Sequence, residues 1–373
     1  MKESIPMSSA DLSEADVEAV LEVVRSGRLA LGPKTAEFER RMAEYCGVKH
    51  AIATNSGTAA LHVLVIASGI GPGDEVLVPS FTFAASVNAI LYERATPVFV
   101  DIEPDTYNLD PDDVARKITP RTKAIMAVDV FGHPAEWDAL QAVADKHGLP
   151  IIDDCCEALG AEYRGRKLGQ FGVAGAFAFY PNKQMTTGEG GIIVTNDDRI
   201  NELSRSLCNQ GRGEKGEWLE HERLGYNYRL DEMSSALGVS QLKRLPEFLD
   251  KRENVARAYI ERLRNCDWAT PMPVRAHVRK SWFVFVITMA PGIDLARVQK
   301  YVAEKHGIPL RRYFNPVHEQ TYVARQFGST VGPLPVTDAV SKRTLAIPFH
   351  NNLSLEEIEQ VVDVLGAAVG YAS

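Results

Sequence analysis

The sequence predicts an α/β fold in which a mostly parallel sheet is covered by helices on both faces. Between residues 51 and 154, short apolar segments alternate with segments of helical pattern. The short segments are apolar on both faces, which is typical of parallel strands buried between two helical layers. At 373 residues, 45% of them hydrophobic, the chain is long for one domain, so two domains are expected.

Two helices are expected before the first strand. Ser13 is followed by acidic residues, which is typical of a helix N-cap, and the helix that it begins should end near Gly27. A second helix is expected over residues 34–46, ending at Gly47.

The alternating region then follows in order. The expected strands are 51–54, 75–79, 97–102, 123–130 and 149–154. The expected helices are 57–67, 84–92 and about 136–146. Ligand sites in such folds lie beyond the carboxyl ends of the strands, where the loops converge.

The last third of the chain is expected to form a second domain. From Asp231 the pattern is helical over a long stretch, with Pro246 as its main interruption, and this stretch is interpreted as the connection between domains. The predicted division is a large domain over 1–245 and a small one over 246–373. The elements expected in the small domain are a strand over 282–288 and helices over 294–306 and 356–369.

Composition argues against several classes of protein. The formal net charge is −8 with no clustered basic segment, so no nucleic-acid partner is expected. The longest apolar stretch, AALHVLVIASGI, is too short to span a bilayer, and MKESIPMSS lacks the apolar core of a secretory signal. The five cysteines include adjacent Cys155 and Cys156 and no closely spaced metal-ligand set. We therefore expect reduced thiols in a cytoplasmic protein, and no metal.

The stretch FAFYPNKQMTTGEGGIIV, residues 177–194, places Lys183 between two segments that both read as buried strand. A lysine in a loop is usually solvated surface. Close to apolar walls, however, its charged form is disfavoured, and the amine can become the nucleophile that Schiff-base chemistry requires.

Two other segments could complete a site around this lysine. In NSGTAAL, Gly57 allows a ligand to approach the backbone, Thr58 adds a hydroxyl, and the helix start offers N–H groups to a phosphate. LPIIDD ends an apolar strand with Asp154, whose carboxylate needs a partner such as a protonated pyridine nitrogen. The plain alternatives are a turn capped by Ser56 or Thr58, and an aspartate that caps the next helix.

Five motifs in this order resemble the DegT/DnrJ/StrS sugar aminotransferases, fold-type I enzymes that use pyridoxal 5′-phosphate (PLP). They are NSGTAAL, PSFTFAASVNA, IIDDCCEALGAEYRGRKLG, FAFYPNKQMTTGEGG and LGYNYRLDEMSSALG, and the similarity runs from about residue 29 to residue 318. The resemblance implies a large domain with a mostly parallel seven-stranded sheet and a smaller C-terminal α+β domain.

The resemblance also implies roles for individual residues. Lys183 matches the lysine that holds PLP as a covalent aldimine and moves the proton between substrate carbon and cofactor carbon. Asp154 matches the carboxylate that pairs with the pyridinium nitrogen, so that the ring acts as an electron sink. Phe83 matches the aromatic that stacks on the ring, and Gly57 and Thr58 match the phosphate cradle.

Further roles concern the partner subunit and the substrate. Asn227, in GYNYR, matches an asparagine that reaches the phosphate from the neighbouring subunit, so a homodimer with active sites at its interface is implied. RRYFNPVHEQ resembles the stretch that approaches the sugar, with His318 and then Tyr313 as its candidate contacts, or it is a surface loop. Arg212 and Arg229 could offset the diphosphate of a nucleotide, or pair with local acids.

Three positions differ from the family pattern or allow more than one role. The family usually has a serine phosphate ligand five residues before the lysine, where this chain has Ala178, so one donor is missing. Glu157 stands where glutamine or histidine often contacts the ring hydroxyl. A charged glutamate would repel a phenolate, so Glu157 is protonated, turned away or tuning the cofactor. Glu189, in GEGG, either points into the site or stabilises the turn.

Together these features predict a PLP-dependent aminotransferase that moves an amino group from L-glutamate to a nucleotide-linked keto-(deoxy)sugar. The alternatives are an aminotransferase for a non-sugar ketone, such as a cyclitol or an aromatic-amine precursor, and a regulatory protein of the same fold without the chemistry. A PLP-dependent sugar dehydratase is disfavoured because relatives of that kind tend to replace the lysine with histidine, and Lys183 is present.

Overall fold

The computed structural model describes residues 5–213 and 220–372, so the first four residues of MKESIPMSS lie outside it. Its centre is a seven-stranded sheet with strand order β1-β9-β8-β5-β4-β2-β3. The strands are β1 (His50–Thr54), β2 (Glu75–Pro79), β3 (Thr96–Val100), β4 (Thr122–Val128), β5 (Ile151–Asp154), β8 (Ala174–Ala178) and β9 (Gly191–Thr195). β9 runs antiparallel to both of its neighbours, β1 and β8, and every other adjacent pair in this sheet is parallel, so the predicted mostly parallel sheet is confirmed.

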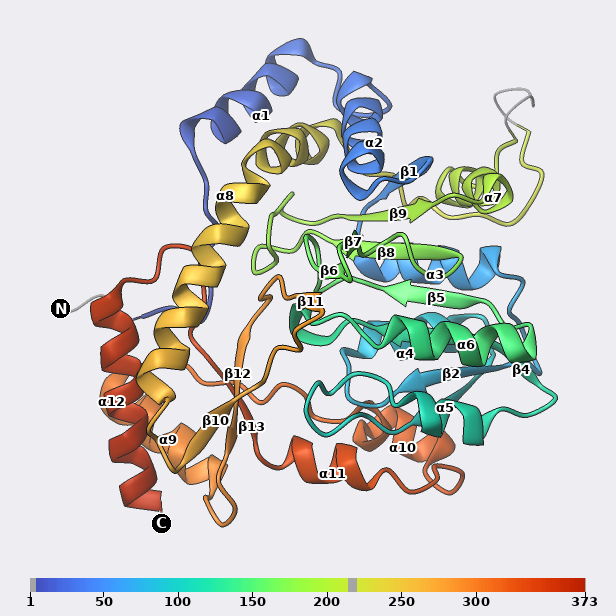
Figure 1. Ribbon diagram of the computed structural model, residues 1–373. Coiled ribbons are helices and arrows are strands. Elements are labelled where there is room, and N and C mark those ends of the chain that lie inside the picture. The colour runs from blue at the N-terminus through green and yellow to red at the C-terminus, as the bar shows by residue number, and fades with distance from the viewer. Residues whose placement is uncertain (1–4, 214–219, 373) are drawn as a thin grey trace.

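Helices cover both faces of this sheet (Figure 1). One face packs against α2 (Pro33–Cys46), α6 (Trp137–His147) and the first part of α8 (Glu232–Leu263), with α5 (Pro111–Lys117) at its edge. The other face packs against α3 (Gly57–Ala67), α4 (Ala84–Tyr92) and α7 (Asp198–Cys208). Successive residues of a strand face opposite layers, as Ile151 and Ile152 do, which explains why these strands are apolar throughout.

The predicted ends of the N-terminal helices are confirmed. α1 spans Glu14–Ser26, and the backbone N–H of Ser13 donates to Asp16 Oδ2 over 2.8 Å in a capping box. Gly27 and Gly47 end α1 and α2 with φ of 68° and 70°, a left-handed conformation that glycine adopts without steric cost.

The long helix α8 differs from the prediction in one respect. It continues through Pro246 instead of breaking there, although it changes direction along its length (Figure 1). Proline removes one backbone N–H donor and bends a helix. Leu245 and Phe248, both fully buried, hold α8 against the core on either side of the proline. The division between residues 245 and 246 falls inside this helix and stays a prediction.

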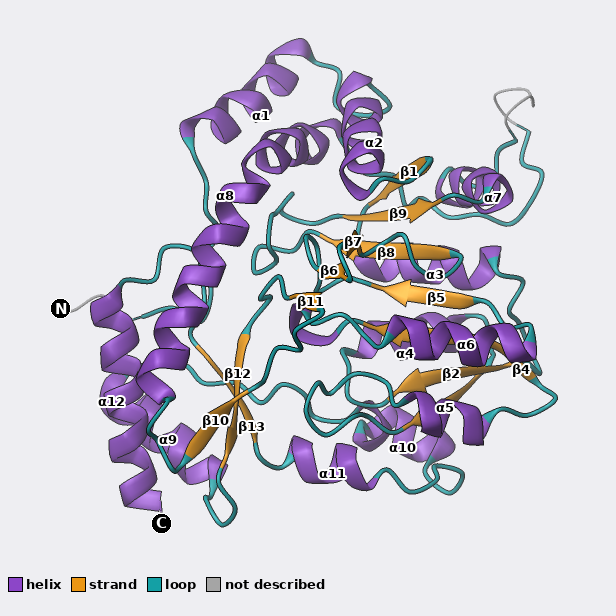
Figure 2. Cartoon of the chain, in the orientation of Figure 1, coloured by secondary structure: helices purple, strands orange, loops and turns teal. Residues whose placement is uncertain are grey.

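The C-terminal part is an α+β unit (Figure 2). Its antiparallel sheet has the order β10 (Ala269–Pro271), β12 (Phe285–Met289), β13 (Thr344–Ile347), and it shares a core with α9 (Leu295–His306) and α12 (Leu355–Ala372). The strand expected over 282–288 thus begins three residues later than predicted.

Smaller elements complete the described chain. They are β6 (Glu162–Tyr163), β7 (Arg166–Lys167), β11 (Val278–Arg279), α10 (Thr321–Phe327), α11 (Pro335–Ser341) and the 3₁₀ turns η1 (Val130–Gly132) and η2 (Val317–Glu319). Residues of η2 and α10 pack back onto the large sheet, against the layer that contains α3 and α4. Over 5–213 and 220–372, no helix has the length and apolar composition needed to cross a membrane.

Candidate active site

A cavity of about 460 Å³ lies where the loops after β1, β5 and β8 converge with the C-terminal unit. This volume is typical of a small-molecule site. The predicted cofactor residues in its lining are Gly57, Thr58, Phe83, Asp154, Glu157 and Lys183. Two of the predicted substrate residues, Glu189 and Tyr313, also line it.

Lys183 lies in the loop between β8 and β9, with its side chain only 13% exposed. Its Nζ is 3.8 Å from the ring centre of Phe283 and 4.0 Å from Glu157 Oε1. Its backbone carbonyl accepts a 2.8 Å hydrogen bond from Arg252 Nη2 of α8. Burial and backbone fixation therefore aim this amine into the cavity.

Arg252 is a supporting residue that sequence reasoning missed. It is 2% exposed, and it donates to the carbonyls of Lys183, Trp282 and Phe283 over 2.8–3.1 Å. Burial lowers its pKa to about 10, so it remains a cation at neutral pH. It joins the lysine loop to the segment that carries Phe283, which forms another wall of the cavity.

Asp154 is the last residue of β5 and is 5% exposed. Its Oδ2 accepts a 2.6 Å hydrogen bond from Ser86 Oγ of α4, and its Oδ1 accepts the N–H of Cys156 over 3.2 Å. Among the described side chains, no lysine, arginine or histidine forms a salt bridge with it. A buried carboxylate without a cationic partner from the chain is suited to a cationic ligand. Ser86, in PSFTFAASVNA, was not identified from the sequence.

Glu157 lines the cavity, and its role toward the ring hydroxyl stays a prediction. Its Oε2 accepts the N–H of Phe131 over 2.9 Å, and its side chain is buried. Burial raises the pKa of this carboxyl to about 7, although the positive charge of Lys183 opposes the increase. A substantial protonated fraction at neutral pH follows.

The turn between β1 and α3 forms the opposite end of the cavity. Ser56 is the N-cap, since its Oγ accepts the N–H of Ala59 over 3.1 Å, and Thr58 is left to line the cavity. A β-carbon on Gly57 would lie 2.6 Å from Cβ of Ala178, so glycine allows α3 to approach β8 closely. The N–H groups of a first helical turn have no intrahelical acceptor and are suited to bind an anion.

Phe83 is 63% exposed although it lines the cavity, and Tyr180 nearby is 51% exposed. Large aromatic side chains exposed at a cavity are suited to contact a ligand or a partner. Tyr180, Asn182 and Phe283 belong to the lining but were not identified from the sequence. The first two lie beside Lys183 in the quoted motif, whereas Phe283 lies far away in the sequence, just before β12, with no local signal.

Four predicted residues lie outside this cavity. His318 Nδ1 hydrogen-bonds to Ser80 Oγ over 2.7 Å. Arg212 and Arg229 both donate to Asn209 Oδ1, over 3.4 and 2.9 Å. Asn227, two residues before Arg229, pairs through its backbone with Asn209 in an isolated β-bridge. Their proposed contacts with cofactor or substrate stay predictions, and for Asn227 the predicted contact is with a neighbouring subunit.

The sheet topology and this cavity together define the class of fold-type I PLP-dependent transferases. Comparison with known proteins identifies the family. A family model described as the DegT/DnrJ/EryC1/StrS aminotransferase family matches residues 10–366. The chain therefore belongs to this family of PLP-dependent aminotransferases, and the match extends beyond the range of similarity inferred from the motifs.

Individual relatives agree with this assignment. The chain is 40% identical over 339 residues to GDP-perosamine synthase of Caulobacter vibrioides, which covers 90% of each chain. EpsN of Bacillus subtilis, described as a pyridoxal phosphate-dependent aminotransferase, is 34% identical over 98% of this chain and 96% of its own. The structure of Helicobacter pylori PseC, an aminotransferase of pseudoaminic acid biosynthesis, matches with a TM-score of 0.93 and 31% identity over 99% of this chain and 100% of PseC.

The residues of the cavity fit PLP. Lys183 supplies an amine and Asp154 a carboxylate that has no cationic partner among the described residues, and both line one cavity of suitable volume. The start of α3 can accept a phosphate at Gly57 and Thr58, and the exposed ring of Phe83 can cover a flat heterocycle.

Proposed function

We propose that this aminotransferase transfers the amino group of L-glutamate to a keto group on a nucleotide-linked sugar. The observation that carries the proposal is the joint placement of the largely buried side chains of Lys183 and Asp154 in one cavity. The sugar substrate is supported by the relatives, one of which is named a GDP-perosamine synthase.

When bound, PLP supplies an electron sink that stabilises negative charge on the reacting substrate carbon. The Nζ atom of Lys183 would hold the cofactor and, once the amino substrate displaces it, would act as the base that moves a proton between neighbouring carbon atoms. The carboxylate of Asp154, oriented by Ser86, keeps the pyridine nitrogen protonated. Phe83 would cover one face of the ring and exclude water from it.

The remaining cavity residues complete the proposed site. Gly57 and Thr58 bind the phosphate at the start of α3, without the hydroxyl that a serine at position 178 would add. Glu157, in its protonated form, can donate a hydrogen bond toward the ring hydroxyl and avoids repulsion there. Glu189 and Tyr313 line the same cavity and are the proposed substrate contacts within it.

We further propose that a second copy of the chain completes each site, as the family resemblance implies. Support comes from the exposed Phe83 and Tyr180 at the cavity, and from Asn227 and Arg229, which lie outside the cavity of their own chain. Mixing inactive Lys183→Ala and Asn227→Ala subunits should restore activity up to a quarter of the wild-type value at statistical reassortment, because half of the dimers are mixed and each holds one intact site. Activity no higher than that of the separate variants would refute a shared site.

The five cysteines are all free thiols, which supports the proposed cytoplasmic location.

The first experiment locates the lysine that binds PLP. The purified protein should be yellow, borohydride should bleach it, and peptide mass spectrometry should place the reduced pyridoxyl group on Lys183. Lys280 is the matched control, because it is also buried and burial lowers its pKa to about 7, which makes it a competing neutral amine. Lys183→Ala should abolish the visible band and Lys280→Met should retain it. The opposite pattern would refute the assignment of Lys183.

The second experiment identifies the amino acceptor. The pyridoxamine phosphate form of the protein is offered nucleotide-linked keto-sugars and, separately, non-sugar ketones. Return of the visible band with nucleotide-linked sugars supports the proposal. Return only with non-sugar ketones would replace it with the alternative predicted from the sequence.

A further inference from the structure

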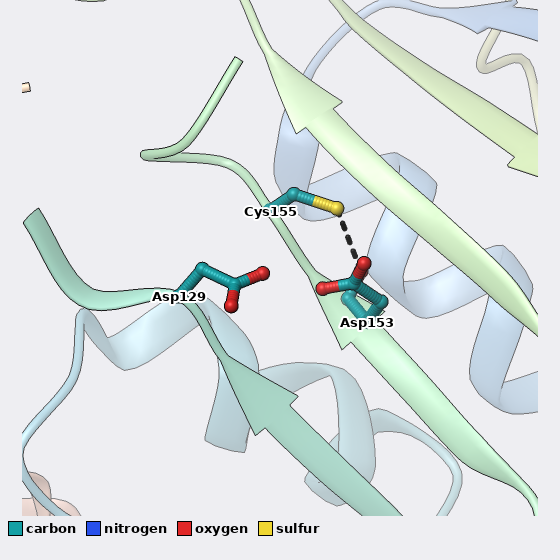
Figure 3. A group of neighbouring side chains, drawn as sticks. All are labelled: Asp129, Asp153 and Cys155. Atoms are coloured by element: carbon teal, nitrogen blue, oxygen red, sulfur yellow. Dashed lines mark hydrogen bonds between the residues drawn. The ribbon is translucent and has the colours of Figure 1, made fainter. Parts of the chain in front are cut away.

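Two aspartates outside the cavity lining face each other in the core. Asp129 directly follows β4 and Asp153 belongs to β5, and both are 0% exposed. Figure 3 shows their side chains pointing toward each other, with Cys155 beside them. One side-chain ligand atom from each of the three residues lies within 4.8 Å of the other two.

Each carboxylate has one oxygen that the surrounding chain satisfies. Asp129 Oδ1 accepts the N–H of Ala135 over 2.7 Å and the Nε1–H of Trp137 over 3.3 Å. Asp153 Oδ2 accepts the N–H of Gly169 over 3.2 Å. The other two oxygens, Asp129 Oδ2 and Asp153 Oδ1, have no partner among the described residues. Orphan acceptors in a dry core are costly, and a proton held between the two carboxyls would satisfy both.

The charges around the pair favour one bound proton. Neither carboxylate forms a salt bridge within the described part of the chain. The other titratable groups that act on them electrostatically are the buried thiols of Cys155 and Cys46 and, from the opposite face of the sheet, the Asp154 carboxylate, and none of these supplies a positive charge. Burial and the neighbouring carboxylate raise the pKa of Asp129 well above its usual range, and burial raises the pKa of Asp153 to about 6.

We propose that Asp129 and Asp153 share one proton, and that this bond joins the carboxyl ends of β4 and β5 to position Asp154 and Glu157. The role of this aspartate pair in positioning Asp154 and Glu157 rests on the proposed function. The Asp129 N–H donates to the backbone carbonyl of Asp154 over 3.2 Å. Two residues after Asp129, the N–H of Phe131 donates a hydrogen bond to Glu157 Oε2.

Alternation along β5 explains how the pair acts without entering the cavity. Asp153 and Asp154 are successive residues of one strand, so their side chains lie on opposite faces of the sheet. Asp153 is bound on the face of α2 and α6, while Asp154 is presented to Ser86 on the face of α4. The proton shared on one face thus anchors the strand end whose other face meets the cofactor.

The test begins with full-length, cofactor-free protein labelled with ¹³C-aspartate. Infrared spectra at pH 7.5 should show one protonated aspartyl carbonyl band that shifts with the label and is absent from Asp129→Asn. The aspartate label separates this band from any contribution of Glu157. Absence of such a band in the wild-type protein would overturn the proposal.

A second measurement uses the pH dependence of unfolding. A carboxyl whose pKa is raised by folding stabilises the native state most at low pH and loses that stabilisation as the pH rises toward its folded pKa. Relative to Asp129→Asn, the wild-type unfolding constant should increase by up to about tenfold per pH unit between pH 5 and 7. The amide of the Asp129→Asn variant keeps a hydrogen-bond donor toward Asp153 but cannot titrate. Equal slopes in the two proteins would contradict the shared proton.

Positioning is tested on the cofactor-loaded protein. Asp129→Asn should keep PLP affinity within threefold of the wild-type value, because the bond between the strand ends remains. Asp129→Leu, which removes that bond, should weaken affinity at least tenfold or prevent folding. Equal affinity in a folded Asp129→Leu variant would refute the positioning role.

A buried cation site is the competing interpretation of the same cluster. Cobalt(II) added to the cofactor-free protein should give no thiolate charge-transfer band, since the Cys155 thiol donates to the Asp153 carbonyl over 3.6 Å and burial raises its pKa. A band that Cys155→Ser abolishes would overturn the proposal in favour of a metal. Because the infrared and unfolding measurements use no PLP, the shared proton can be confirmed even if Lys183 is not labelled.

Discussion

Replacing Glu157 with glutamine should remove part of the pH dependence of stability in the cofactor-free protein. The carboxyl is buried, and its pKa is raised from 4.5 to about 7 in the folded state. The native state therefore holds this proton more tightly than the unfolded chain does. The resulting stabilisation is complete below about pH 4.5 and is lost as the pH rises through 7.

The size of the effect follows from the shift in pKa. A difference of about 2.5 pKa units at about 1.4 kcal/mol per unit corresponds to about 3 kcal/mol of unfolding free energy. Relative to Glu157→Gln, the wild-type protein should lose about this amount between pH 4.5 and 8. Glutamine keeps an acceptor for the Phe131 N–H, so the hydrogen bond itself is not tested.

Urea unfolding, followed by tryptophan fluorescence at half-unit steps of pH, measures this difference. Glu189→Gln is the control, because Glu189 lines the same cavity but is exposed to solvent. The Glu189→Gln variant shows how the unfolding free energy changes when the cavity loses one carboxylate that is not buried. A wild-type minus Glu157→Gln difference that stays constant from pH 4.5 to 8 would refute the reasoning that burial dominates at this carboxyl.

Three further substitutions test the supports of the site, each by urea unfolding of the cofactor-free protein. Ser86→Ala removes a 2.6 Å hydrogen bond to the Asp154 carboxylate and should cost about 2 kcal/mol, whereas no change would show that solvent replaces the hydroxyl. Arg252→Met removes the hydrogen bonds donated to four backbone carbonyls and should cost about 3 kcal/mol, with weaker PLP binding; unchanged stability and affinity would contradict its supporting role. Gly132→Ala should cost at least about 2 kcal/mol, because φ is 81° and the new β-carbon would lie 2.8 Å from atoms of the C-terminal unit. Its control is Gly148→Ala, also at positive φ but in open space, and an equal cost in both variants would show that the close contact is harmless.

Local signals in the sequence determined much of the architecture. Ser13 and Gly27 mark the ends of α1, and the apolar runs mark strands of the large sheet, because capping and two-sided burial depend on residues near in sequence. The predicted interruption at Pro246 was wrong, because the buried side chains on either side of the proline hold α8 against the core and the helix continues. The short helices α5 and α7 were not predicted.

The motifs also determined the family and the cavity residues that lie within them. Lys183, Asp154 and Gly57 are recognisable because each occurs in a short segment whose neighbours shape the same site. The neighbours of Lys183 also contain Tyr180 and Asn182, which the structure adds to the lining.

Only the tertiary structure decided how these groups are held. Ser86 meets Asp154 from 68 residues away, and Arg252 reaches the carbonyl of Lys183 from 69 residues away. Asp129 faces Asp153 because β4 and β5 are neighbours in the sheet. Such pairs depend on strand order, register and helix placement, which arise from burying the whole chain at once. No local pattern records them, and for that reason the sequence identified the chemical groups while the fold determined their partners.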